Sequence, residues 1–148
     1  QAVGHQCMKN STSTYSTAMG YNALTGAGGD YACAFGMNAG ASNTANSNIF
    51  VGYDSGTANT SGARITAIGM DAYDASDTEN DNVAIGFEAM HSNTAGGEEN
   101  VSLGNYTLQD LTSGDKNIGV GYGSLSAVTT GSENVGIGDN ALGQLTTA

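Results

Sequence analysis

The chain has 148 residues, of which 23 are glycine, none is proline or tryptophan, and only 11% are charged. Gly, Ala, Ser, Thr and Asn occupy 88 positions, so the large apolar side chains that build an ordinary enzyme core are scarce. Fourteen acidic residues against three basic ones give a net charge of −11. That balance disfavours nucleic acid and anionic membranes as partners, and no apolar run is long enough to predict membrane insertion.

A short phrase recurs along the chain, in its clearest form at 82–86 (NVAIG), 100–104 (NVSLG), 117–121 (NIGVG) and 134–138 (NVGIG). Each copy ends in a glycine, which we call the anchor. Nine anchors lie 16 to 18 residues apart: Gly4, Gly20, Gly36, Gly52, Gly69, Gly86, Gly104, Gly121 and Gly138. So narrow a spread predicts a single repeat array over residues 1–148. We expect this array to be part of a longer fibre protein.

The three residues before each anchor alternate in size. The first and third are mostly bulky, as in Val83 and Ile85, whereas the residue between them is small, as in Ala84. Phe50 is the exception in the small column. Alternation with period two predicts a strand. We expect the bulky side chains to face the core and the small-residue strip to lie outside, where another backbone can approach closely.

One short strand per repeat, in parallel register, predicts an all-β fold. The architecture we expect is a parallel β-solenoid or β-roll of about nine coils of 16–18 residues. Coils stacked about 4.8 Å apart would make a rod of roughly 40 Å. Five asparagines share one column, which indicates either an axial hydrogen-bonded stack or ordinary turn chemistry: Asn48, Asn82, Asn100, Asn117 and Asn134.

A cluster of acidic residues is the candidate ion site. It comprises Asp71, Asp74, Asp77, Glu79 and Asp81, and calcium prefers several such oxygens within one loop. The spacing matches neither an EF-hand nor a nonapeptide calcium repeat, so we favour a solvated acidic loop. No residues are predicted to be catalytic or to bind a cofactor, because no nucleophile, base and orienting group converge in the repeat.

Cysteine and aromatic residues complete the candidates. Cys7 and Cys33 lie two coils apart, about 9.6 Å, which exceeds the ~7 Å Cα limit for a disulfide; we expect two thiols that do not pair within the chain. Aromatic residues follow several anchors directly and predict either a sugar-stacking surface or packing over the core, which we favour: Tyr21, Tyr53, Phe87 and Tyr122.

The segments 82–90 (NVAIGFEAM), 117–125 (NIGVGYGSL) and 134–142 (NVGIGDNAL) resemble the repeats of bacteriophage tail fibres. They are similar also to the head repeats of trimeric autotransporter adhesins, whose strands build trimeric β-rolls. The resemblance implies a fibrous homotrimer. Since the repeats here are longer than the usual adhesin-head repeat, they favour the tail fibre. Few large apolar side chains per coil likewise favour a core shared among chains.

The predicted function is therefore a structural and adhesive fibre segment, most simply of a phage tail fibre serving host attachment. The alternative is a secreted bacterial adhesin or a self-assembling extracellular filament subunit. An ice-binding solenoid and a polysaccharide-degrading enzyme are less favoured, since a Thr-x-Thr array and a carboxylate pair are lacking. We expect no enzymatic activity and no cofactor. The expected partners are further copies of the chain and a host cell-surface glycan or protein, on a virion or outside the cell.

Overall fold

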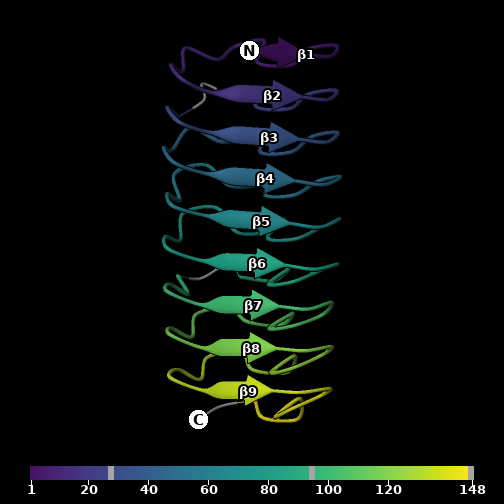
Figure 1. The fold of residues 1–148 in the computed structure, drawn as a ribbon. Coiled ribbons are helices and arrows are strands. Elements are labelled where there is room, and N and C mark those ends of the chain that lie inside the picture. Colours follow the sequence, from purple (N-terminus) through teal and green to yellow (C-terminus); the bar gives the residue numbers. More distant parts are fainter. Residues whose placement is uncertain (27–28, 94–95, 147–148) are drawn as a thin grey trace.

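The computed structural model describes residues 1–26, 29–93 and 96–146, and these residues contain strands and turns but no helix. Nine short strands are present in them: β1 (Ala2–Val3), β2 (Thr17–Met19), β3 (Cys33–Phe35), β4 (Ile49–Val51), β5 (Thr66–Ile68), β6 (Val83–Ile85), β7 (Val101–Leu103), β8 (Ile118–Val120) and β9 (Val135–Ile137). Each strand pairs in parallel with the next, giving one sheet in chain order. The coils stack into a rod with the two ends of the chain at opposite ends (Figure 1). The predicted β-solenoid is confirmed.

The strand side chains point the opposite way from the prediction. In every strand from β2 to β9 the middle residue, which is small except for Phe50 in β4, is buried and the flanking residues are not. Ala84 is fully buried, whereas Ile85 keeps 36% of its surface exposed. The small-residue strip therefore lines the interior, and the expectation that it lies outside is wrong. The coil is too narrow for bulky side chains from the sheet in addition to those that other positions supply.

Those other positions lie four residues after the anchors. Leu24, Tyr73, Met90, Leu108 and Leu125 are all fully buried there, and they fill the space opposite the alanines of the strands. These residues, the buried alanines and Ile65, Leu111 and Val128 form one continuous core along the rod.

Phe50 shows how tightly this core is filled. It occupies the small column of β4 and is fully buried. Two coils compensate by placing glycine where the others have a large side chain. A Cβ at Gly40 would lie 2.5 Å from the Phe50 ring, and Gly56 faces the same ring. A large residue on one wall is thus matched by two small residues on the other, as close packing requires.

Two backbone features repeat in each coil. The anchor glycines adopt φ between 121° and 141°. They also lie directly against the next coil, since a Cβ at Gly121 would be 2.5 Å from the Gly138 carbonyl oxygen. The corners are made by left-handed residues, most of them not glycine, such as Asp81, Glu88 and Met90 at φ of 61°, 49° and 50°. Each such residue costs roughly 1 kcal/mol, so coil stacking must compensate for these corners.

The asparagine column forms an axial ladder in the C-terminal half. Asn100, Asn117 and Asn134 each donate Nδ2–H to the Oδ1 of the preceding asparagine, at 3.3, 3.1 and 3.0 Å. Asn82, Asn100 and Asn117 also donate to a glycine carbonyl across the coil, at 2.8–2.9 Å. Asn48 stands apart from this ladder, because the next coil has Ile65 in the column and only its backbone N–H reaches Asn48 Oδ1, at 2.8 Å. The stacked interpretation is therefore confirmed from Asn82 to Asn134.

Candidate functional surface

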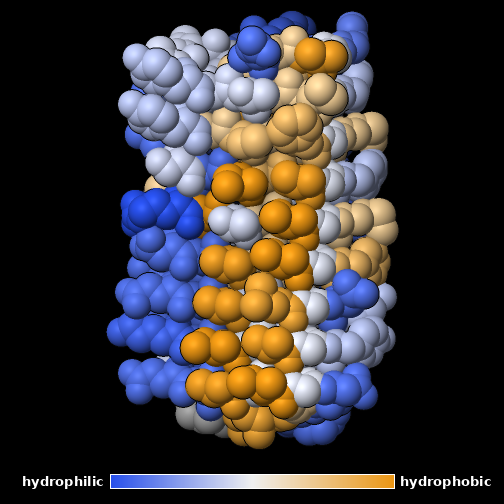
Figure 2. All heavy atoms as spheres, in the orientation of Figure 1, coloured by the Kyte–Doolittle hydropathy of each residue, from blue (hydrophilic) through white to orange (hydrophobic). Residues whose placement is uncertain are grey.

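The outward-facing strand residues form a continuous apolar surface along the rod. We call it the apolar sheet face and define it by Val3, Thr17, Met19, Cys33, Phe35, Ile49, Val51, Thr66, Ile68, Val83, Ile85, Val101, Leu103, Ile118, Val120, Val135 and Ile137. Exposure is considerable at several of these residues, with 41% for Ile49, 56% for Val135 and 71% for Ile137. Figure 2 shows a hydrophobic stripe over the strands, strongest toward β9, paler toward β1 and interrupted on one side at the level of β5. No charged residue belongs to it, in a chain of net charge −11.

The two borders of this face differ in chemistry. On one side, the corner residues just before the strands are charged from β5 onward: Arg64, Asp81, Glu99, Lys116 and Glu133. Figure 2 shows a hydrophilic column beside the stripe. On the other side, the residues just after the anchors are half-exposed and mainly aromatic or Met: Tyr21, Met37, Tyr53, Met70 and Tyr122. The apolar surface therefore ends sharply at one border and continues at the other.

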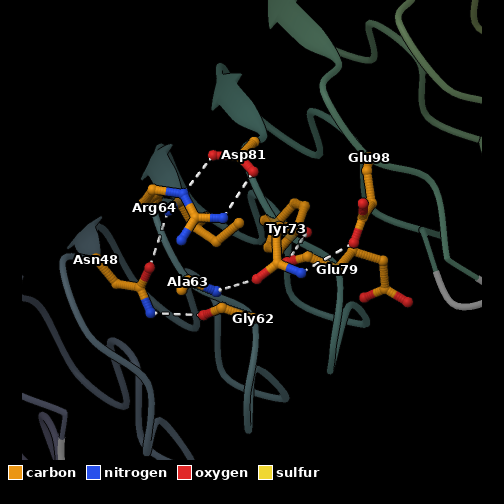
Figure 3. Close-up of polar contacts among 10 residues, drawn as sticks. Asn48, Gly62, Ala63, Arg64, Tyr73, Glu79, Asp81 and Glu98 are labelled. Atoms are coloured by element: carbon orange, nitrogen blue, oxygen red, sulfur yellow. Dashed lines mark hydrogen bonds and ion pairs between the residues drawn. The ribbon is translucent and has the colours of Figure 1, made fainter.

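Arg64 and Asp81 are joined across adjacent coils at the charged border (Figure 3). The guanidinium donates two hydrogen bonds to the carboxylate, through Nε and through Nη2, the latter at 2.7 Å. These bonds lower the pKa of Asp81. Both side chains remain well exposed, so the pair adds little to stability.

The structure does not gather the five acidic candidates into one site. Asp81 binds Arg64, and Asp74 Oδ1 lies 2.6 Å from His91 Nδ1. Glu79 is buried, and its carboxylate accepts 3.0 Å hydrogen bonds from the backbone N–H groups of residues 77, 78 and 96. Asp71 is partly buried near Asp74 and His91, whereas Asp77 is exposed. Across the described ranges, no group of three His, Cys, Asp or Glu side chains is placed to hold a metal ion.

Sequence reasoning missed the structural role of Glu79. It occupies the column that glycine fills in several other coils, seven residues before the anchor. Tyr73 in the same coil donates its hydroxyl to the Glu79 carbonyl at 3.2 Å and accepts from Asn82 Nδ2 at 2.9 Å (Figure 3). Burial raises the pKa of Tyr73 above its ordinary value. The departure of Glu79 from the glycine pattern was the available signal.

Asp71 lies beside two further carboxylates in neighbouring coils, and this gives a pH-dependent prediction. Burial raises its pKa, and the charges of Asp54 and Glu88 raise it further, while His91 opposes them. A carboxyl group whose pKa is raised on folding favours the folded state while it is protonated. That contribution to stability is lost when the group ionises. Stability is therefore lost as the pH rises from the unfolded value of 3.8 through the raised pKa.

We expect Asp71→Asn to melt at a higher temperature than the wild type at pH 7, because the variant removes this unfavourable ionisation. Below pH 3.8, where Asp71 is protonated in both states, the difference should vanish. Thermal melts followed by circular dichroism at the two pH values measure both quantities. A variant that melts lower than the wild type at pH 7 would contradict the assignment.

Three of the four aromatic residues that directly follow an anchor do not pack over the core. Tyr21, Tyr53 and Tyr122 are 45%, 46% and 54% exposed, so the favoured interpretation is wrong for them. Phe87 and Tyr122 each contact Tyr106 edge to face, with ring centroids 5.2 and 5.5 Å apart. These rings form a short aromatic ladder on the surface.

The two cysteines occupy different environments. Both are unpaired, Cys7 packing against the core and Cys33 belonging to the apolar sheet face. Burial raises the pKa of the Cys33 thiol.

The described part of the chain has no pocket and no helix of the length and hydropathy needed to cross a membrane. No family model, curated protein or solved structure matches the sequence. We take the apolar sheet face as the candidate functional surface, because its exposed apolar side chains do not contribute to the core of the single chain.

Proposed function

We propose that the chain is a segment of an extended homotrimeric fibre, most simply a phage tail fibre, that serves attachment to a host surface. The resemblance of its repeats to tail-fibre repeats supports this proposal. The observation that carries it is the apolar sheet face, a contiguous apolar strip without charged residues, since the largest apolar patch on a protein surface is often a site of interaction. Function then resides in length, stiffness and multivalent display rather than in a catalytic site.

The area of the face favours three chains over two. With nine strands about 4.8 Å apart and a face about 10 Å wide, each chain offers about 400 Å². A stable interface needs roughly 800 Å² per partner, so two chains joined only through this face fall short. In a closed trimer each chain contacts two neighbours, through the face and through both borders. That arrangement adds the area of both borders to the area that the face buries.

Trimerisation also suits an adhesive role. Three linked copies of a weak receptor contact bind far more tightly than one, because the second and third contacts form at high effective concentration.

Sedimentation equilibrium of the intact chain tests the proposal. We expect three times the chain mass of 14.8 kDa, unchanged over a tenfold range of protein concentration. A stable monomer would contradict the fibre proposal. Open-ended growth to larger masses would instead favour the self-assembling filament.

A further inference from the structure

We propose that Tyr15 and Tyr31 form a modification site at which one-electron oxidation joins their rings by a carbon–carbon bond. The product is dityrosine, which ties together the coils that contain β2 and β3. The oxidant is a haem peroxidase with hydrogen peroxide, an enzyme class that accepts exposed phenols. Both rings belong to one chain, so this inference does not rest on the proposed trimer.

The solenoid places the two rings face to face. Each tyrosine lies two residues before a strand, Tyr15 before β2 and Tyr31 before β3, and these strands pair in register. The ring centroids are 5.3 Å apart and the ring planes are 8° from parallel. Tyr15 is 81% exposed and Tyr31 is 61% exposed. Both phenols are therefore open to an oxidant and already adjacent to each other.

Folding of the chain does not account for this pair. Tyr15 and Tyr31 have φ of 58° and 60°, a left-handed conformation that is unfavourable for a bulky side chain. The equivalent corners of the next coils carry Ser47, Arg64 and Asp81, so the fold does not require an aromatic ring there. Two adjacent coils nevertheless both carry tyrosine, which points to a use of the phenols themselves.

The parallel stack suits the coupling of two phenoxyl radicals. Each oxidation removes one electron and one proton from a phenol and leaves unpaired spin on the oxygen and on ring carbons that include Cε1 and Cε2. When both rings are oxidised, a Cε of one ring bonds to a Cε of the other. Each of these carbons then releases its proton while a phenol oxygen regains one, which restores both aromatic rings. One molecule of hydrogen peroxide accepts the two electrons and two protons and gives two molecules of water.

No other pair of tyrosines in the described ranges is stacked in this way. Tyr73 is buried, Tyr21 stacks on a histidine, and the residues level with Tyr53 in both adjacent coils are methionines. Tyr106 and Tyr122 do meet, with centroids 5.5 Å apart, but their planes are 75° apart. Stacked rings lie with their carbons against one another, whereas an edge-to-face contact presents the edge of only one ring. This second pair is therefore the internal comparison for the first.

Peroxidase treatment of the intact chain with hydrogen peroxide tests the site. The product is identified after denaturation and cleavage before aspartate, because Asp30 lies between the two tyrosines. A Tyr15–Tyr31 bond keeps fragments 1–29 and 30–53 together, at their summed mass less two hydrogen atoms. Tyr15→Phe preserves the ring but removes the phenol, and Tyr122→Phe is the matched control. The same treatment of the chain in denaturant shows whether the folded geometry is needed.

We expect dityrosine fluorescence and the joined fragment from the folded wild type and from Tyr122→Phe. At least fivefold less of the fragment is expected from Tyr15→Phe and from the unfolded chain. On a denaturing gel the product should keep the mass of one chain. Absence of the joined fragment from the folded wild type, or an equal yield from Tyr15→Phe, would overturn the site. A greater yield of the Tyr106–Tyr122 product would overturn the role of stacking, and product formed only between chains would overturn the assignment to a single chain.

Discussion

Ala84→Asp is expected to unfold the chain. Ala84 is fully buried between Ala67 and Ser102 of the adjacent strands, and the small column has no room or partner for a carboxylate. An uncompensated buried charge costs about 3–5 kcal/mol, a large share of the stability of a domain of this size. The far-ultraviolet circular dichroism signal of the strands should be lost, or the melting temperature lowered by more than 10 °C.

Ala84→Ser is the matched control. Ser102 occupies the same column in β7 and donates its hydroxyl to the Thr107 carbonyl at 2.8 Å. The equivalent carbonyl, that of Ala89, lies at the same distance along the chain from residue 84. We therefore expect Ala84→Ser to change the free energy of unfolding by no more than about 1 kcal/mol. Equal effects of Ser and Asp would show that the column does not line the core.

Ile85→Asp is expected to leave the chain folded but to dissociate the proposed trimer. Ile85 is adjacent to Ala84 but points to the opposite side of the sheet, where 36% of it is exposed in the single chain. Solvent can reach a carboxylate at this position in a monomer, so the cost to folding is about 1 kcal/mol. In the assembly three such carboxylates would lie together in an apolar interface, which removes them from water and opposes like charges. Strand content measured by circular dichroism should remain, in contrast to Ala84→Asp.

The contrast between these neighbouring residues also marks the limit of what the sequence could predict. The anchor spacing from Gly4 to Gly138 predicts the solenoid, and the size alternation predicts each strand. Alternation alone, however, does not say which face points inward. The decisive information lay in the position four residues after each anchor. Leu24, Met90, Leu108 and Leu125 at that position already fill the interior of a narrow coil with large side chains.

Compensation within the core was visible in principle but not recognised. Phe50 breaks the small column, and Gly40 and Gly56 break the large one in the same region. The connection between these three residues is visible only in the folded coils, where both glycines lie against the Phe50 ring. The same applies to Glu79, whose carboxylate is satisfied by backbone N–H groups from two coils. Spacing in the sequence does not reveal such contacts.

The acidic candidates illustrate a further limit. Residues 71–81 read as one loop, but in the described structure their carboxylates do not converge on a metal-binding site. Partners of Asp74 and Asp81 come from the neighbouring coils, as His91 and Arg64. In a solenoid, a residue one repeat away is therefore a closer neighbour than many residues within the same loop. Clusters are better sought down the columns than along the chain.

The most direct test of the apolar sheet face as the assembly interface is sedimentation equilibrium of Ile85→Asp beside Thr130→Asp. Thr130 is exposed and lies outside the face, so both variants add the same charge to the surface of the single chain. The account predicts one chain mass, 14.8 kDa, for Ile85→Asp and three chain masses for Thr130→Asp. Three chain masses for both variants would contradict it.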